Sequence, residues 1–346
     1  MVHPRNIPLG AQAGAISLPV CDHYCGVEAR MVKSLQLQAE MMQEFGACVF
    51  DVTLDCEDGA PVGGEIDHAN MVAASVLSAC VAPKSVVTSI HQANDKKPKR
   101  RVAVRVHAVD HASFESDIDI IVGKAGGYLS HVMVPKVDTV ADVERAVGLI
   151  DAANKLHSDL LPIHVLLESP KAIHNAFDIA AHPRVQSLSF GLMDFVSSHG
   201  GAIPAHAMGL SGQFMHPLVV RAKLAIASAC HAHGKVPSHC VVTEFSDANA
   251  IRNAALQAAN TMGFTRMWSI HPTQIRPILA AFAPDDKDIE AASDIINAGV
   301  EADWAPINYK GTLHDRASYR YYWQVLERAH QTGRAMDTSV AHFFNE

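Results

Sequence analysis

The chain has no long hydrophobic run, few aromatic side chains and little charge: 6% of its 346 residues are aromatic and 18% are charged. None of its apolar stretches approaches the roughly 20 residues that cross a bilayer. Its first residues, Met1-Val2-His3-Pro4-Arg5, lack the apolar core of a signal peptide. We therefore expect a cytoplasmic protein. The 7 cysteines form an odd, scattered set, which predicts reduced thiols and no disulfide framework.

The chain also lacks a surplus of basic residues. Its net charge is -8 and its pI is about 6.2. Nucleic acids and anionic membranes both require a basic face, so neither is expected as the main partner. A small anionic substrate is compatible with this charge if positive groups gather at one site. With 49% hydrophobic residues, the composition is that of an ordinary globular enzyme.

Short apolar runs recur along the chain, and each is followed by a longer segment rich in Ala and Leu. This alternation is typical of repeated βα units, and eight such units close a barrel. We therefore predict a (β/α)8 TIM barrel over residues 1–283 and a C-terminal helical extension over residues 284–346. The expected strands are Ala15–Val20, Ala47–Leu54, Arg101–Val106, His131–Pro135, Pro162–Glu168, Gln186–Gly191, His239–Val242 and Met267–His271.

Two of these runs end on a carboxylate. Glu168 follows Val165-Leu166-Leu167, and Asp194 follows Phe190-Gly191-Leu192-Met193. The carboxyl ends of parallel strands meet at one edge of the barrel, where hard oxygen ligands can hold a divalent cation. The pattern predicts a metal-dependent active site.

An arginine lies within another apolar run, Val102-Ala103-Val104-Arg105-Val106. A further run, ending Leu54-Asp55-Cys56-Glu57-Asp58, places three acids after a strand, which is too much like charge to gather without a cation or an arginine. Arg105 is the obvious partner, because its planar fork can bind a carboxylate or a developing enolate at two points. A structural ion pair at the barrel mouth explains the same pattern equally well.

These residues carry a resemblance to the citrate lyase β-subunit-like branch of the HpcH/HpaI aldolase and citrate lyase family. Six short motifs occur in the family's order between about residues 50 and 275. They are Leu54-Asp55-Cys56-Glu57-Asp58-Gly59-Ala60, Arg105-Val106-His107 (Arg-Val-Asn in the family), Val134-Pro135-Lys136-Val137, Leu167-Glu168-Ser169, Phe190-Gly191-Leu192-Met193-Asp194 and Ser269-Ile270-His271-Pro272-Thr273-Gln274-Ile275.

The resemblance implies a role for each matching residue. Glu168 and Asp194 would hold Mg²⁺, with Mn²⁺ as a substitute, and Arg105 would steady the enolate oxygen. Glu57 and Asp58 would support the arginine and the waters of the metal.

The resemblance also extends to the C-terminal extension. Gly311-Thr312-Leu313-His314-Asp315 resembles a C-terminal segment of the family whose aspartate reaches the site of a neighbouring subunit. This makes Asp315 the expected acid/base group. It also implies a homo-oligomer, by family resemblance a trimer or hexamer.

The resulting hypothesis is a Mg²⁺-dependent carbon–carbon lyase that cleaves a hydroxyacyl substrate, as a coenzyme A thioester, to a 2-oxo acid and an enolate-derived product. Two alternatives stay open: a coenzyme A-independent aldolase acting on a 4-hydroxy-2-oxo acid, and a noncatalytic barrel subunit of a larger complex. Thioester recognition is in doubt because the glycine turn and nearby arginine of the family's first strand are absent from Ser17-Leu18-Pro19-Val20-Cys21-Asp22-His23-Tyr24-Cys25.

Two further expectations concern residues outside the proposed metal site. Lys136 is expected to be ion-paired at the barrel mouth and not to form a Schiff base. Four residues at helical spacing, Tyr319, Tyr322, Trp323 and Leu326, predict an apolar helix face that packs on another subunit.

Overall fold

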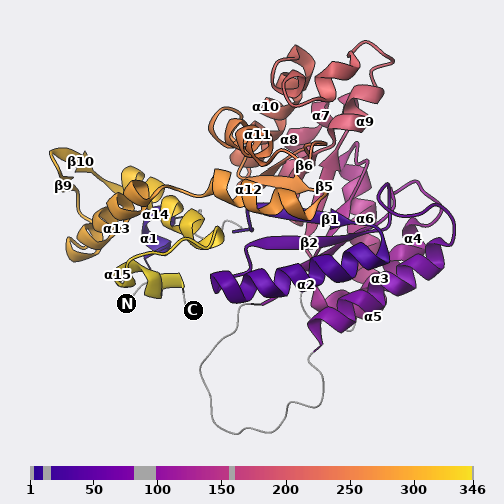
Figure 1. Ribbon diagram of the computed structural model, residues 1–346, viewed down its shortest axis with the longest axis horizontal. Coiled ribbons are helices and arrows are strands. Elements are labelled where there is room, and N and C mark those ends of the chain that lie inside the picture. The colour runs from indigo at the N-terminus through magenta and orange to yellow at the C-terminus, as the bar shows by residue number, and fades with distance from the viewer. Residues whose placement is uncertain (1–3, 11–16, 82–98, 156–159, 345–346) are drawn as a thin grey trace, which may run out of the picture.

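The computed structural model describes residues 4–10, 17–81, 99–155 and 160–344. Eight parallel strands follow one another around a closed barrel, and β8 pairs with β1 to complete it. Helices surround the barrel, and a separate group of helices lies beyond one of its ends (Figure 1). The predicted barrel fold is confirmed. No helix in the described part of the chain is both long and apolar enough to cross a membrane.

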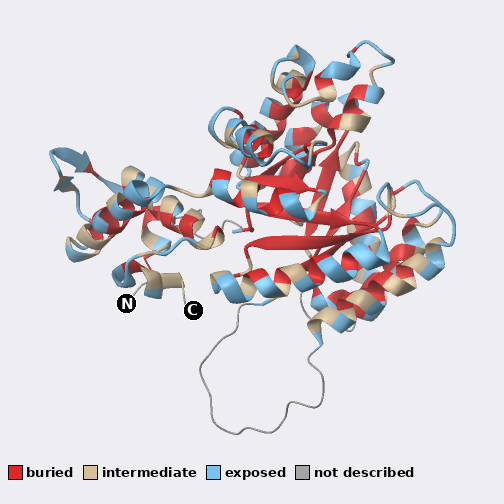
Figure 2. Ribbon diagram, viewed as in Figure 1, coloured by how far each residue is buried: buried red, intermediate tan, exposed pale blue. Residues whose placement is uncertain are grey.

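The barrel strands are short and buried. Figure 2 shows their ribbons as mostly buried, as expected for parallel strands covered by helices outside and by side chains inside. The strands are β1 Cys21–Cys25, β2 Phe50–Asp55, β3 Val102–Arg105, β4 Leu129–Val134, β5 Ile163–Leu167, β6 Val185–Phe190, β7 Val236–His239 and β8 Arg266–Ser269.

Two strands lie elsewhere along the chain than predicted, whereas the other six differ from the prediction only at their ends. Ser17–Val20 precede β1, which begins at Cys21, and residues 15 and 16 of the expected strand lie outside the described residues. The seventh strand begins three residues earlier than predicted, at Val236. Both strands carry polar residues at inward positions, Asp22 and Ser238, and these interrupted the apolar pattern on which the prediction depended.

The longer helices alternate with the strands and bury one face each (Figure 2). The helix Pro217–Ala232 (α10) opens on a proline, and the helix Val140–Ala153 (α6) follows Thr139, whose side chain takes part in a capping box. The helices are α1 Asn6–Leu9, α2 Glu28–Phe45, α3 Glu65–Cys80, α4 Phe114–Asp117, α5 Gly123–Ala125, α6 Val140–Ala153, α7 Pro170–His174, α8 Ala176–Ala181, α9 Leu192–Ser197, α10 Pro217–Ala232, α11 Ala248–Asn260, α12 Pro272–Phe282, α13 Asp286–Glu301, α14 Arg316–Gln331 and α15 Thr338–Ala341, with short helical turns at Ile118–Val122, Gly126–Tyr128, Ala205–Met208, Gly212–Phe214 and His342–Phe344.

Inward-facing side chains fill the barrel in layers. Toward the amino ends of the strands lies a buried polar layer that includes Asp22, Asp51, His131, His164 and Arg266. Two residues further along four of these strands comes an apolar layer of Tyr24, Met133, Leu166 and Trp268, in which the Tyr24 and Trp268 rings stack 4.6 Å apart. The carboxyl ends of the strands, where Asp55, Arg105 and Glu168 lie, form the third level. The barrel is therefore packed, and only its carboxyl end can bind a substrate.

The C-terminal extension has a core of its own. Tyr319, Trp323 and Leu326 on α14 are buried with Ile295 and Ile296 of α13. The expectation that this aromatic face is free to pack on another subunit is therefore wrong: α13 covers it within the same chain. A hairpin of β9 Ile307–Tyr309 and β10 Thr312–His314 precedes α14.

The N-terminal helix packs with the extension. Leu9 of α1 belongs to the second core, and the Arg320 side chain of α14 donates to the Pro8 carbonyl at 3.2 Å. Helix α1 accordingly lies beside α14 in Figure 1. Ile7 and Leu9 therefore pack with the extension, although the prediction assigned them to the barrel domain.

Candidate active site

Arg105 is held at the carboxyl end of β3 by a carboxylate from the neighbouring strand. Asp55, at the end of β2, pairs with Arg105 in the strand register and accepts hydrogen bonds from Nε at 2.7 Å and Nη2 at 2.5 Å. Both side chains are buried. Although burial alone would raise the pKa of Asp55, the Arg105 charge and hydrogen bonds hold it below its ordinary value. The bidentate contact fixes the plane of the guanidinium group.

Glu57 links this arginine to Lys136. Its Oε2 lies 2.9 Å from Arg105 Nη1, and its Oε1 contacts Lys136 Nζ. Lys136 is thus ion-paired at the barrel mouth, as predicted. Asp58 makes a weaker contact, 3.5 Å from Lys136 Nζ, and its side chain is 57% exposed. Glu57 therefore supports Arg105 directly, whereas Asp58 does so only through Lys136.

Lys136 also positions Glu168 through its backbone. Its amide donates to Glu168 Oε1 at 2.8 Å, and its φ of 52° lies in the left-handed region. A residue other than glycine is strained in this backbone conformation, which persists only where surrounding contacts enforce it. One residue therefore contacts both Glu57 and Glu168, by side chain and by main chain.

Glu168 and Asp194 are close enough for their charges to repel. Burial, and then the charge of Asp194, raise the pKa of Glu168 well above its ordinary value of 4.5. A Cβ added at Gly191 would stand 2.5 Å from Glu168 Oε2, so glycine leaves the room that this carboxylate occupies. Two crowded carboxylates, one buried and one half-buried in the first turn of α9, fit a hard divalent cation, which would relieve their repulsion.

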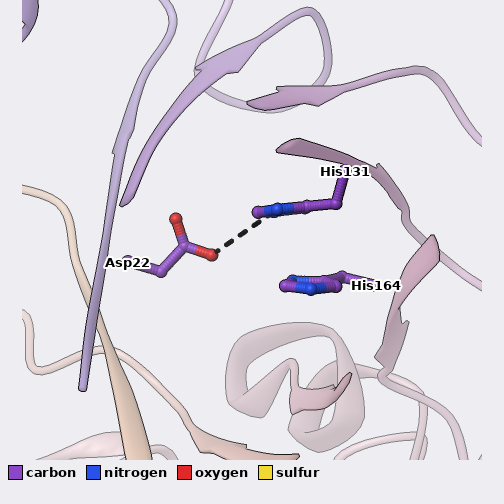
Figure 3. Close-up of side chains that lie close together, drawn as sticks. All are labelled: Asp22, His131 and His164. Carbon is purple, nitrogen blue, oxygen red and sulfur yellow. Dashed lines mark ion pairs between the residues drawn. The ribbon is translucent and has the colours of Figure 1, made fainter. Parts of the chain in front are cut away.

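A different group, Asp22, His131 and His164, also brings metal-ligand atoms together within 4.8 Å. Figure 3 shows both rings edge-on, one above the other, with their tips toward Asp22. The rings stack 3.5 Å apart at 14°. A metal ion shared between them would stand half that separation out of each ring plane, whereas imidazole binds a metal along its in-plane lone pair at about 2 Å. Arg266 already occupies the Asp22 carboxylate at 2.6 Å. This layer is a structural polar core, and its geometry does not suit a metal ion.

Asp315 lies at the opposite end of the barrel from Arg105. It caps α14, where it accepts hydrogen bonds from the backbone of Ala317 and Ser318. The same helix contacts the amino end of the barrel: the Gln331 side chain donates to Ser17 at 2.7 Å. Asp315 therefore does not join the site of its own chain, and any part in catalysis would have to be played at another subunit.

A histidine–aspartate pair near Arg105 was missed by the sequence analysis. Asp117 is buried and accepts from His107 Nδ1 at 2.6 Å and from the His107 backbone at 3.0 Å. His107 lines a cavity of about 500 Å³ together with Glu57, Lys136 and His111. The available signal was the histidine that stands where the resembling motif has asparagine.

The first strand ends in a glycine turn, so the expectation that this turn and a nearby arginine are absent is wrong. Gly26 directly follows β1, and Arg30 lies four residues further along. A Cβ at Gly26 would stand 2.0 Å from the carbonyl oxygen of Gly59, so the position requires glycine. The turn was missed because the predicted strand ended at Val20, and the segment compared with the family stopped at Cys25.

Comparison with known proteins agrees with this geometry. The family model of HpcH/HpaI aldolase/citrate lyase matches residues 36–272. An L-malyl-CoA/β-methylmalyl-CoA lyase of Cereibacter sphaeroides is 30% identical over 250 residues, which cover 67% of this chain and 77% of the relative.

Two solved structures share the fold. A citrate lyase of Burkholderia xenovorans is 47% identical with a TM-score of 0.76, covering 98% of this chain and 99% of that one. The protein CitE of Mycobacterium tuberculosis, solved with magnesium, acetoacetate and coenzyme A, is 19% identical with a TM-score of 0.63, covering 90% of this chain and 98% of that one. The chain is a carbon–carbon lyase, and it belongs to the HpcH/HpaI aldolase/citrate lyase family.

Proposed function

We propose that the protein is a Mg²⁺-dependent lyase that cleaves a hydroxyacyl coenzyme A thioester into a 2-oxo acid and an acyl thioester, by way of an enolate. The observation that carries the proposal is the shared contact of Lys136. The Lys136 side chain contacts Glu57, which is ion-paired with Arg105. The Lys136 amide donates to Glu168, which lies near Asp194. The Arg105 guanidinium and the carboxylates of Glu168 and Asp194 are thereby held at the same end of the barrel.

Each residue has a distinct part in this proposal. Glu168 and Asp194 would hold Mg²⁺, which when bound polarises the carbonyl of the 2-oxo acid. Arg105 stabilises the negative charge that develops on the enolate oxygen, and Asp55 keeps its guanidinium from rotating. The Arg105 charge is well suited to this, because Asp55 and Glu57 raise its pKa even though burial opposes the charged form.

Coenzyme A enters the proposal through two observations. The Cereibacter sphaeroides relative is named for malyl thioesters, and its match extends over 77% of its length. The glycine turn at Gly26, once thought missing, follows β1. Acyl thioesters also enolise more readily than free carboxylates, which suits a site built around one arginine.

Subunit assembly is a separate part of the proposal. Asp315 would act in a neighbouring subunit of a homo-oligomer, because it lies at the far end of its own barrel. The trimer or hexamer suggested by the family resemblance offers such neighbours.

A substrate panel tests the proposal. L-malyl-CoA, other hydroxyacyl thioesters and free 4-hydroxy-2-oxo acids would each be incubated with Mg²⁺ and, in parallel, with chelator, and 2-oxo acid release would be measured. We expect thioester cleavage that chelator abolishes and Mg²⁺ restores. Cleavage of free acids alone would favour the coenzyme A-independent aldolase, and the absence of any cleavage would favour a noncatalytic subunit.

A further inference from the structure

We propose that His107, oriented by Asp117, is an acid–base residue of this site that transfers the proton at the carbon next to the thioester carbonyl. The inference rests on the proposed function. It leaves to Asp315 of a neighbouring subunit a different proton, that of the substrate hydroxyl.

The contact with Asp117 fixes the proton on one side of the imidazole ring. Asp117 is 1% exposed, and its Oδ2 accepts from His107 Nδ1 at 2.6 Å. Because Nδ1 must donate in this contact, the neutral ring carries its lone pair on Nε2. No described group hydrogen-bonds to Nε2 of His107. This nitrogen is therefore available to accept or to give a proton.

Stacking fixes the plane of the same ring. His107 and His111 lie face to face, with ring centroids 4.2 Å apart and an interplanar angle of 9°. The His107 backbone amide also donates to Asp117 Oδ2, at 3.0 Å. This backbone bond holds the loop after β3 against Asp117. The shorter contact to Nδ1 orients the imidazole ring.

The cavity that His107 lines adjoins the proposed reaction centre. Two of its other walls are Glu57 and Lys136. Glu57 also contacts Arg105, and the Lys136 amide contacts Glu168. A substrate held at Arg105 and Glu168 can thus extend a reacting carbon into a cavity of about 500 Å³ that His107 faces.

The proposed step is a single proton transfer. When the carbon–carbon bond of the substrate breaks, the hydroxyl proton passes to Asp315 of a neighbouring subunit, and the O–H electron pair forms the carbonyl of the 2-oxo acid. The carbon–carbon electron pair becomes the enolate double bond, with negative charge on the oxygen near Arg105. Protonated His107 breaks its Nε2–H bond, keeps that electron pair, and gives the proton to the enolate carbon, which forms a new C–H bond. In the reverse direction neutral His107 removes the same proton.

Hydrogen exchange isolates this step from carbon–carbon cleavage. Acetyl-CoA would be incubated in D₂O with the Mg²⁺-loaded protein and oxalate, which chelates the ion as a 2-oxo acid does but offers no carbonyl for condensation. Deuterium in the acetyl group is measured by mass spectrometry. We expect exchange by the unaltered protein and a fall of about a hundredfold or more in His107→Gln, as loss of a general acid–base group predicts.

Matched variants separate proton transfer from structural support. Glu115→Gln neutralises an exposed carboxylate on the same helix as Asp117 and should keep exchange near the unaltered rate. Asp117→Asn should lower exchange while the KM for L-malyl-CoA changes little. Added imidazole should partly restore exchange to His107→Ala.

A readout without catalysis completes the test. Diethyl pyrocarbonate should modify His107 at Nε2, and acetyl-CoA should protect it, as mapped by peptide mass. Exchange in His107→Gln equal to that of the unaltered protein, or no modification of His107, would overturn this inference alone. Failure of the unaltered protein on every thioester would instead overturn the proposed function.

Discussion

Two clusters of buried charge lie inside one barrel, and they differ in balance. In the layer near the amino ends, Asp22 and Asp51 face Arg266, whose Nη2 lies 2.6 Å from each, and Asp51 also pairs with Arg101 at 2.5 Å. Each carboxylate has a guanidinium partner. At the carboxyl ends, neither Glu168 nor Asp194 forms an ion pair with a described residue. Burial and then the charge of Asp194 raise the pKa of Glu168, and Arg105 opposes them only in part.

The difference shows that burial alone does not mark a functional site. Both clusters break the apolar pattern of their strands, and both contain a fixed arginine. Only the cluster at the carboxyl ends of the strands, the upper cluster, carries surplus negative charge and adjoins a cavity. The cluster near the amino ends, the lower cluster, is sealed beneath Tyr24 and Trp268, and each of its carboxylates is ion-paired with an arginine. Uncompensated charge with access from solvent is thus the better indicator of chemistry.

The largest expected effect is from removing one charge in each cluster. Glu168→Gln should lower kcat by about a thousandfold or more, since the Lewis-acid contribution of a metal is several kcal/mol. Its melting temperature should hold or rise, because the repulsion from Asp194 is relieved. Asp22→Asn should show the opposite: near-normal kcat in the folded fraction and a stability loss of about 3 kcal/mol, because a buried ion pair is broken. Kinetics and thermal melts of both variants check this. Equal kcat losses in the two would erase the distinction.

The two arginines offer the next contrast. Arg105→Lys keeps the charge but loses the fork held by Asp55, so kcat should fall about a hundredfold, comparable with loss of an oxyanion donor. Arg266→Lys should mainly lower stability. Steady-state kinetics and denaturant unfolding of the purified variants would be compared. A change of KM alone in Arg105→Lys would mean that this arginine only binds substrate.

Subunit mixing tests whether the upper cluster is completed from outside. Asp315→Asn and Asp194→Asn should each be nearly inactive, and Asn keeps the cap of α14 because it is as good an N-cap as Asp. After subunit exchange, hybrids contain some sites with neither lesion, so part of the activity should return. Mass spectrometry would verify the hybrids. Full activity in Asp315→Asn alone would remove that residue from catalysis.

The smallest expected effect is on pH dependence. Burial, followed by the charge of Asp194, raises the pKa of Glu168 well above 4.5. Below pH 4.5 the carboxyl is protonated in both the folded and the unfolded states, and above it only the folded state keeps the proton. The stability of chelator-treated protein should therefore fall as pH rises from 4.5 through the raised pKa. Glu168→Gln should flatten this slope, and Mg²⁺ should reverse it. Unfolding midpoints measured across pH provide the test, and an unchanged slope in the variant would contradict it.

Much of the upper cluster could be read from the sequence because its residues follow apolar strands. Arg105, Glu168 and Asp194 each interrupt or end such a run, and alternation along parallel strands brings them to one edge. Asp55 was read as one acid among three, since sequence spacing does not say which carboxylate pairs with the arginine. The register of β2 against β3 decides it.

Other features could not be predicted because they depend on packing between distant segments. Asp117 lies in a helix ten residues after His107, and nothing local indicates that its side chain turns back toward β3. The packing of α13 on Trp323 could likewise not be predicted, because it depends on how the extension folds. The error at β1 had a local cause: Asp22 and His23 made the true strand look polar, although both are buried in the barrel wall.

The contact between Gly26 and Gly59 joins two loops that could otherwise move independently. The Gly59 amide donates to Asp55 Oδ2 at 2.9 Å, and Asp55 holds Arg105. A ligand that displaces the turn after β1 must therefore alter the free energy of the arginine's position. By thermodynamic reciprocity, an anion bound at Arg105 must change the affinity of that turn for its ligand by the same factor. The link runs from the backbone contact of Gly26 and Gly59 through the Asp55 carboxylate to Arg105, and a side chain at residue 26 would disrupt its first contact.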